Sequence, residues 1–294
     1  MMRPKATYVR PGTLTEAVDL LQDLDDRCKL LAGGTDVATE LRSGAIRGRC
    51  LVDLSALPEL KGIHEAEEEL VIGSGVTLSE IASSAGVARG APALAKAAAV
   101  FGSRQIRNMA TIGGNICRAS PAGDTLPPLY VQDAELELTS SSKTRRVSIR
   151  DFIQGPGRID LKAGEILKCI RLKKAADFTM HRFDKIGNRK ALAVSIVNLA
   201  GLVALSPDGI IQRIRLAWGS VAPTVVRSSR VEAFLTGKPL RMETLDQAYP
   251  LVQDAISPID DARASAAYRR RVAVGLLFRL TTQQESPDSI MDIA

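Results

Sequence analysis

Residues 101–124 read FGSRQIRNMATIGGNICRASPAGD, and the rest of the chain is best interpreted outward from them. The stretch has little helical or strand periodicity, so we expect a long loop, and a long loop in a compact chain usually has a function. Gly113 and Gly114 stand between Thr111 and Asn115. Paired glycines let a backbone approach a ligand, and successive uncovered N–H groups bind anions. The stretch therefore predicts a site for phosphate or pyrophosphate.

A second glycine pair lies earlier, in the run LLAGGTD at residues 30–36. One glycine pair alone is most often a simple turn. Two pairs flanked by Thr, Asn and Asp favour one extended anionic ligand held at two points. The sequence contains neither G-x-x-x-x-G-K-[ST] nor G-x-G-x-x-G, which argues against a P-loop NTPase and a Rossmann dinucleotide site.

The composition narrows the class of protein. The chain has 294 residues, is 45% hydrophobic and carries a net charge of +6, which favours two domains and does not indicate nucleic-acid binding. The four cysteines form no C-x-x-C pair, so we expect neither a zinc site nor an iron–sulfur cluster in this chain. No segment resembles a signal peptide or is apolar for long enough to span a bilayer. We therefore expect a cytoplasmic protein without membrane association.

Periodicity and turn signals divide the chain. Residues 1–55 alternate strand and helix, which predicts a small parallel α/β subdomain, and residues 56–175 are richer in strands. Residues 176–285 predict three antiparallel strands followed by helices, and residues 286–294 a polar tail. We interpret 1–175 as a ligand-binding domain in two parts and 176–285 as a C-terminal domain.

Two motifs carry a family resemblance. AGGTD at residues 32–36 and TIGGN at 111–115, with the following ICRASPAGDTLPPL, resemble the FAD-binding subunit of the molybdenum hydroxylases. That family includes xanthine dehydrogenase and the medium subunit of carbon monoxide dehydrogenase. The resemblance covers the chain to about residue 285. It implies an α+β fold with a two-part FAD-binding domain of the p-cresol methylhydroxylase/vanillyl-alcohol oxidase type. It also implies a C-terminal domain with a three-stranded antiparallel sheet and a helical bundle.

The resemblance identifies the anionic ligand as noncovalently bound FAD. The residues that it implies as contacts of FAD are Leu30, Leu31, Ala32, Gly33, Gly34, Thr35, Asp36, Val37, Phe101, Thr111, Gly113, Gly114, Asn115, Asp124, Ile166, Leu167 and Lys185. The two glycine motifs would share the pyrophosphate, and Lys185 would lie near the polar edge of the flavin, where a cation stabilises the reduced ring. The role of Arg118 stays open.

Five of these positions also have a purely structural interpretation. Asp124 is equally suited to be the N-cap of the following helix. Phe101 fits a core aromatic at a helix end, Ile166 and Leu167 fit the core of a strand, and Lys185 fits a solvated strand residue.

The absence of paired carboxylates or a catalytic triad argues against acid–base catalysis by this chain. In the family, a large molybdopterin-binding subunit hydroxylates the substrate, and a small subunit with two [2Fe–2S] clusters passes electrons to the flavin. NAD, oxygen or a quinone then accepts them. AGGTD resembles the xanthine and N-heterocycle dehydrogenases more than the carbon monoxide enzymes. The alternatives are a carbon monoxide dehydrogenase medium subunit, a scaffold subunit with a decayed flavin site, and a self-sufficient flavin oxidase.

Overall fold

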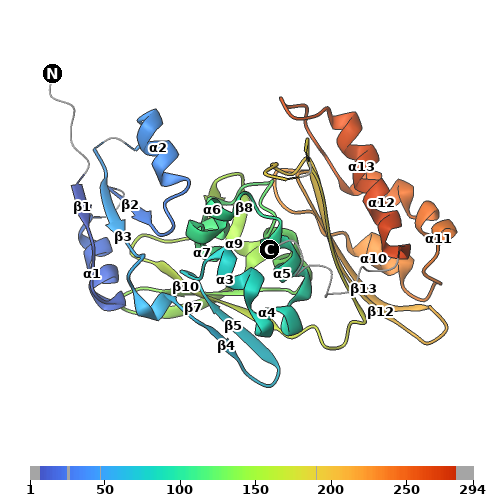
Figure 1. Ribbon diagram of the computed structural model, residues 1–294, viewed down its shortest axis with the longest axis horizontal. Helices are drawn as coiled ribbons and strands as arrows, with labels where there is room; N and C mark the ends of the chain where they lie inside the picture. The colour runs from blue at the N-terminus through green and yellow to red at the C-terminus, as the bar shows by residue number, and fades with distance from the viewer. Residues whose placement is uncertain (1–6, 25–26, 47, 190, 283–294) are drawn as a thin grey trace.

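The computed structural model describes residues 7–24, 27–46, 48–189 and 191–282. Figure 1 shows three sheets that follow one another along the long axis of the molecule, with helices packed against each. The described helices are all too short or too polar to traverse a lipid bilayer.

The first sheet is parallel, as the sequence predicts, with the strand order β1-β3-β2. Its strands are β1 (Thr7–Val9), β2 (Cys28–Leu31) and β3 (Cys50–Asp53), and its helices are α1 (Leu14–Leu24) and α2 (Val37–Ser43). The side chain of Thr13 caps α1 by accepting a hydrogen bond from the N–H of Glu16 at 3.1 Å. Helix α1 then buries Ala17, Val18 and Leu21 against the sheet.

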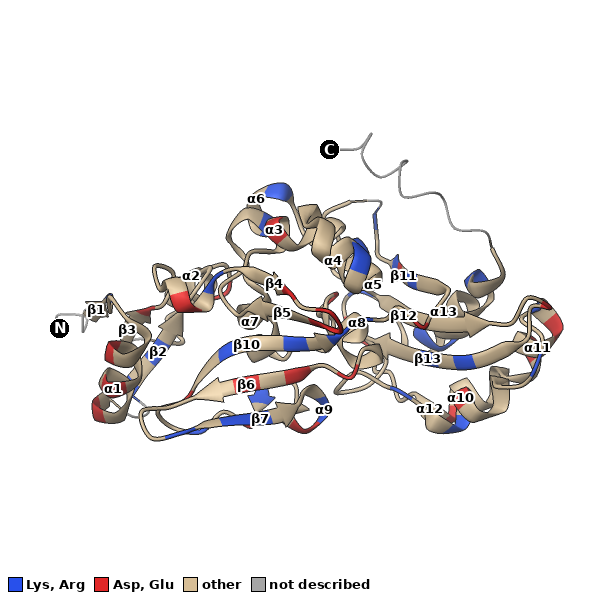
Figure 2. Cartoon of the chain, turned by 90° about the horizontal axis from the view of Figure 1, so that it is seen from below, with Lys and Arg blue, Asp and Glu red and all other residues tan. Residues whose placement is uncertain are grey.

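The second sheet is antiparallel, with the order β4-β5-β10-β6-β7. Its strands are β4 (Ile63–Glu65), β5 (Glu69–Gly73), β6 (Glu135–Thr139), β7 (Thr144–Ser148) and β10 (Ile166–Lys173). Figure 2 shows acidic residues on β6 between basic residues on β7 and β10. Glu137 lies 3.0 Å from Arg171, 3.4 Å from Lys168 and 3.6 Å from Arg146. Cross-strand ion pairs therefore cover this face, and the opposite face carries the apolar core.

Short helices cover the apolar face of the second sheet. They are α3 (Leu78–Ser83), α4 (Ala85–Gly90), α5 (Pro92–Ala99), α6 (Arg104–Met109), α7 (Ile112–Arg118), α8 (Leu126–Val131) and α9 (Ile149–Phe152). Two of them, α6 and α7, lie within the stretch that we expected to be one long loop, so that expectation is wrong. Each has only one or two turns and begins at a hydroxyl N-cap, Ser103 and Thr111 respectively. Helices this short leave little periodicity in the sequence.

The third sheet is antiparallel, with β12 (Val197–Leu205) between β11 (Met180–Ile186) and β13 (Ile211–Gly219). Its outer face packs against α10 (Ser229–Leu235), α11 (Met242–Gln247), α12 (Tyr249–Ala255) and α13 (Ala266–Phe278). On β12, Val197, Leu199 and Val203 face these helices. Ala200, Leu202 and Ala204 face the core of the second sheet instead, as the alternation of a strand requires. The sheet is therefore buried on both faces.

The remaining elements are short. The hairpin of β8 (Ile153–Gly155) and β9 (Arg158–Ile159) follows α9, and 3₁₀ turns occur at Pro58–Leu60 and Arg279–Thr281. The sequence pattern indicates a single helix over residues 244–256, whereas the structure divides this region into α11 and α12, with Pro250 in the first turn of the second.

Candidate functional site

The first glycine motif packs directly against the chain that leads into the second. A Cβ atom built on Gly33 would lie 1.8 Å from the carbonyl oxygen of Met109 and 3.0 Å from Cα of Ala110. Only a glycine permits this approach of two backbones. The motif at residues 30–37 and the motif that begins at Thr111 therefore form one continuous surface, although about 80 residues separate them.

The backbone of the first motif offers hydrogen-bond donors. Within the described residues, no group accepts a hydrogen bond from the N–H of residues 32–36. The carbonyl groups of Gly34 and Asp36 are occupied, because they accept bonds from Ala38, Thr39 and Glu40. Gly34 has a φ of +73°, which a residue with a side chain rarely adopts. A run of N–H groups without an acceptor in the chain suits an anion such as a pyrophosphate.

The second glycine pair differs from this expectation, because its N–H groups are already bonded. Gly113 and Gly114 lie in the first turn of α7. The N–H of Gly113 donates to the carbonyl of Ser74 at 2.9 Å, and that of Gly114 donates to Oγ1 of Thr111 at 3.1 Å. A Cβ on Gly113 would meet Cβ of Ser74 at 2.6 Å. Gly113 thus serves close packing, and the two motifs do not expose equivalent sets of donors.

The structure adds a third glycine turn that our sequence analysis missed, Gly73-Ser74-Gly75 at the end of β5. The N–H of Ser74 donates to the carbonyl of Lys168 at 3.0 Å, while its own carbonyl accepts from Gly113. This turn connects α7 to β10, where Ile166 and Leu167 are buried. The Gly-Ser-Gly sequence directly after a strand was the available signal.

Asp124 lies at the centre of a buried polar cluster. Its Oδ2 accepts a hydrogen bond from Nζ of Lys185 at 2.5 Å, and its Oδ1 accepts from Ser195 at 2.6 Å and from Asn198 at 3.1 Å. Helix α8 begins after Thr125 and has no side-chain cap, so the N-cap interpretation of Asp124 is wrong. The interpretation of Lys185 as solvated is also wrong, because only 12% of its side chain is exposed.

This cluster is joined to the rest of the predicted site. Nζ of Lys185 also donates to the carbonyl of Val100 at 3.3 Å, beside the half-buried Phe101. Oδ1 of Asn115 accepts from Oγ1 of Thr125 at 2.6 Å. The structure therefore brings Asn115, Asp124, Lys185 and the segment at Phe101 together, and Ser74 connects them to Ile166 and Leu167.

Two residues near the glycine motifs had no assigned role. Nε of Arg118, at the end of α7, lies 3.5 Å from Oδ2 of Asp36, and both side chains are about half exposed. Arg118 therefore joins the second motif to the first. Burial raises the pKa of Cys117 to about 12, although the charge of Lys29 opposes the shift. A thiol in this state is a poor nucleophile at neutral pH, which fits a flavin held without a covalent bond.

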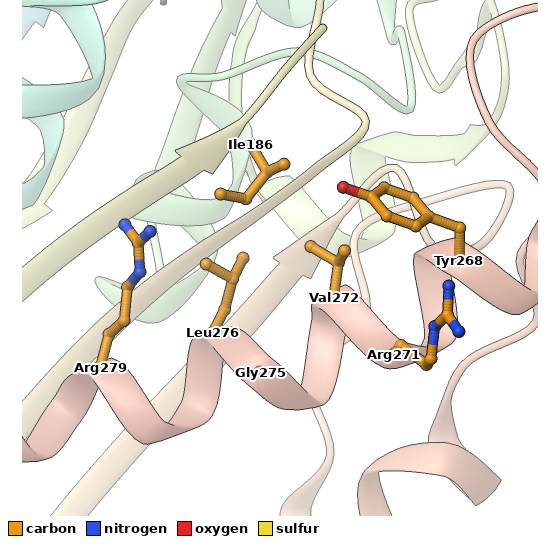
Figure 3. Close-up of a pocket in the computed structure, with 7 residues that line it drawn as sticks. All are labelled: Ile186, Tyr268, Arg271, Val272, Gly275, Leu276 and Arg279. Carbon is orange, nitrogen blue, oxygen red and sulfur yellow. The ribbon is translucent and has the colours of Figure 1, made fainter.

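A groove of about 320 Å³ lies elsewhere, between β11 and α13. Figure 3 shows Ile186, Val272 and Leu276 on its floor, with Tyr268 and the two arginines Arg271 and Arg279 around them. Ile186 and Lys185 are adjacent on β11, so their side chains point to opposite faces of the sheet. The groove is therefore not part of the surface formed by the glycine motifs.

Comparisons with known proteins agree with this geometry. Residues 4–173 match the family described as the FAD binding domain in molybdopterin dehydrogenase, and residues 182–284 match the carbon monoxide dehydrogenase flavoprotein C-terminal domain. The xanthine dehydrogenase FAD-binding subunit of Escherichia coli O157:H7 is 36% identical over 266 residues, covering 90% of each chain. The nicotinate dehydrogenase FAD-subunit of Eubacterium barkeri is 31% identical over 277 residues, covering 93% of this chain and 94% of its own.

Solved structures are similar over nearly the whole chain. Carbon monoxide dehydrogenase from Hydrogenophaga pseudoflava matches with a TM-score of 0.89 and 30% identity, covering 95% of this chain and 96% of its own. Quinoline 2-oxidoreductase from Pseudomonas putida 86 matches with a TM-score of 0.88 and 28% identity over the same shares. From its two glycine motifs, its mixed α/β fold and these relatives, we conclude that the chain belongs to the family of FAD-binding subunits of the molybdenum hydroxylases.

Proposed function

We propose that the surface formed by the two glycine motifs holds FAD and that the chain passes electrons from the [2Fe–2S] clusters of a partner subunit to an acceptor. The observation that carries this proposal is the run of N–H groups at residues 32–36, placed beside the second motif by the contact of Gly33 with Met109. The pyrophosphate would bind these donors, so the residues present fit the cofactor.

The predicted contacts divide into two groups in this proposal. Residues 30–37 would bind the pyrophosphate, with Thr111, Gly113, Gly114 and Asn115 forming the adjoining wall. Phe101, Asp124, Ile166, Leu167 and Lys185 would surround the other parts of FAD. Bound FAD supplies the redox chemistry, because a flavin exchanges electrons singly or in pairs. The ammonium of Lys185, fixed by Asp124, would stabilise negative charge on the reduced ring.

We also propose a xanthine or N-heterocycle dehydrogenase type of complex, with NAD or another molecule as the acceptor. Support comes from the 36% identity to a xanthine dehydrogenase subunit, against 30% to a carbon monoxide dehydrogenase medium chain. The partners would be a molybdopterin-binding large subunit and a small iron–sulfur subunit, and the complex would be cytoplasmic. The FAD-binding domain, residues 1–175, would be of the p-cresol methylhydroxylase/vanillyl-alcohol oxidase type, with residues 176–285 as the C-terminal domain.

The visible spectrum of the purified chain, recorded before and after adding FAD, tests the central proposal. We expect flavin absorption bands at about one FAD per chain, with all flavin released by acid precipitation. A chain that remains colourless alone and in complex with its partner subunits would contradict the proposal and favour a scaffold subunit. Reoxidation of the reduced complex by NAD, oxygen or a quinone then identifies the acceptor.

A further inference from the structure

The polar cluster around Asp124 contains two residues that the family motifs do not include, Ser195 and Asn198. Ser195 is 1% exposed and Asn198 is fully buried. Both donate to Oδ1 of Asp124, at 2.6 and 3.1 Å, and Asn198 also donates to Ser195 at 3.2 Å. The other oxygen of the carboxylate binds Lys185. The two residues therefore fix the rotation of the carboxylate, and this rotation sets the position of the ammonium.

The side chain of Asn198 fits into the sheet because the residue opposite it on β13 is a glycine. It lies on β12, opposite Lys185 on β11 and opposite Gly219 on β13. A Cβ on Gly219 would lie 2.2 Å from Oδ1 of Asn198, so any other residue there would displace the amide. Oδ1 of Asn198 has no hydrogen-bond partner among the described residues. A buried unpaired oxygen reduces stability. The hydrogen bond from the amide nitrogen of Asn198 to Asp124 offsets part of this loss.

Ser195 is held by segments from three parts of the chain. Its carbonyl accepts a hydrogen bond from Oγ of Ser220 at 3.2 Å, and the N–H of Ser220 donates to Pro121 at 2.8 Å. The guanidinium of Arg269, which is 4% exposed, donates to the neighbouring carbonyls of Ile196 at 2.5 Å and Ser220 at 3.2 Å. These bonds fix the backbone that carries Ser195.

We propose that Ser195 and Asn198 are positioning residues that act through Asp124 to hold the ammonium of Lys185 at a fixed place beside the flavin. The position of this ammonium then sets the reduction potential of the flavin. This inference rests on the proposed binding of FAD at this surface. Without the hydroxyl of Ser195, Asp124 loses its shortest donor on Oδ1, so the carboxylate rotates more freely and attracts Lys185 more strongly. The reduced flavin then loses more stabilisation than the oxidised flavin.

The test is the midpoint potential of bound FAD in the complete chain, with FAD affinity measured separately. We expect Ser195→Ala to weaken the binding of reduced FAD about tenfold more than that of oxidised FAD, which lowers the two-electron potential by about 30 mV. Lys185→Met removes the ammonium altogether and therefore gives the largest fall in potential that this mechanism allows. Adding Ser195→Ala to Lys185→Met should change the potential no further, because both act through the same ammonium.

Ser206→Ala is the matched control, since it removes a serine hydroxyl of the same domain that accepts from the N–H of Ile210 and contacts neither Ser195 nor Asp124. An equal shift in Ser206→Ala, or an unchanged potential in Ser195→Ala, overturns the inference while leaving FAD binding intact. A further fall in the double variant overturns it as well. A wild-type chain that binds no FAD, alone or with its partners, would instead refute the proposed function on which the inference rests.

Discussion

Substituting Gly33 by alanine tests whether the contact between the two glycine motifs builds the site. The new methyl group would lie 1.8 Å from the carbonyl oxygen of Met109. Ordinary contacts between non-bonded heavy atoms begin near 3.5 Å, so the two backbones must separate by about 1.7 Å. Both are main chain, and neither can yield by a rotation of a side chain. Overpacking of this kind destabilises a protein by about 1–3 kcal/mol.

We expect Gly33→Ala to lower FAD affinity at least tenfold, because the N–H groups of residues 32–36 move away from the second motif. A tenfold loss corresponds to about 1.4 kcal/mol of binding free energy. Titration of the chain with FAD, followed by flavin fluorescence, measures the affinity, and thermal unfolding measures the stability.

Gly275→Ala provides the control for this prediction. Gly275 lies in α13, and a Cβ there would meet no atom within 4 Å. Alanine in place of a helical glycine stabilises a helix by up to about 1 kcal/mol. We therefore expect Gly275→Ala to retain wild-type FAD affinity. If Gly33→Ala also binds FAD with wild-type affinity and unfolds at the wild-type temperature, the contact does not build the site.

Three further predictions concern protonation, thiol reactivity and the second glycine pair. Burial lowers the pKa of His181 below its ordinary 6.5, so the unfolded chain binds the proton more readily, and stability should fall as pH drops through about 6.5. The free energy of unfolding, measured with urea at pH 5.5 and 7.5, should depend less on pH in His181→Gln than in the wild type. His64→Gln is the control and should not show this reduction, and an equal pH dependence in all three proteins would contradict the prediction. Because burial raises the pKa of Cys117 from 9.0 to about 12, its thiolate fraction at neutral pH falls about a thousandfold, and its alkylation in the native chain should be much slower than that of an ordinary thiol. Rapid alkylation of Cys117 in the native chain, detected by mass spectrometry, would contradict this prediction. Gly114→Val should abolish FAD retention without loss of the fold, and a normal flavin content would exclude Gly114 from the site.

The sequence predicted the first and third sheets because each carries a strong local signal. The parallel first sheet followed from alternating strand and helix, and the third from strand runs separated by turn residues such as those at 206–209. Helices α6 and α7 were missed, since their six and seven residues give too few repeats of a helical period.

The composition of the site was easier to predict than its contacts. The glycine pairs identified the chain segments, but only the structure shows that Gly33 and Gly113 serve close packing while the N–H groups of residues 32–36 have no acceptor among the described residues. The partners of Asp124 on its carboxylate lie 61–74 residues further along the chain. Such distant pairs are set by the packing of the third sheet, which local sequence patterns do not reveal.

The third sheet has a consequence for how the protein unfolds. One core combines Leu70 and Ile72 of the second sheet with Ala200 and Leu202 of β12, while Leu199 on the same strand belongs to the core under the C-terminal helices. Separating the chain after β10 would uncover apolar surface on both fragments at once. The two parts should therefore melt in a single cooperative transition, and a protease cut between them should release no folded fragment.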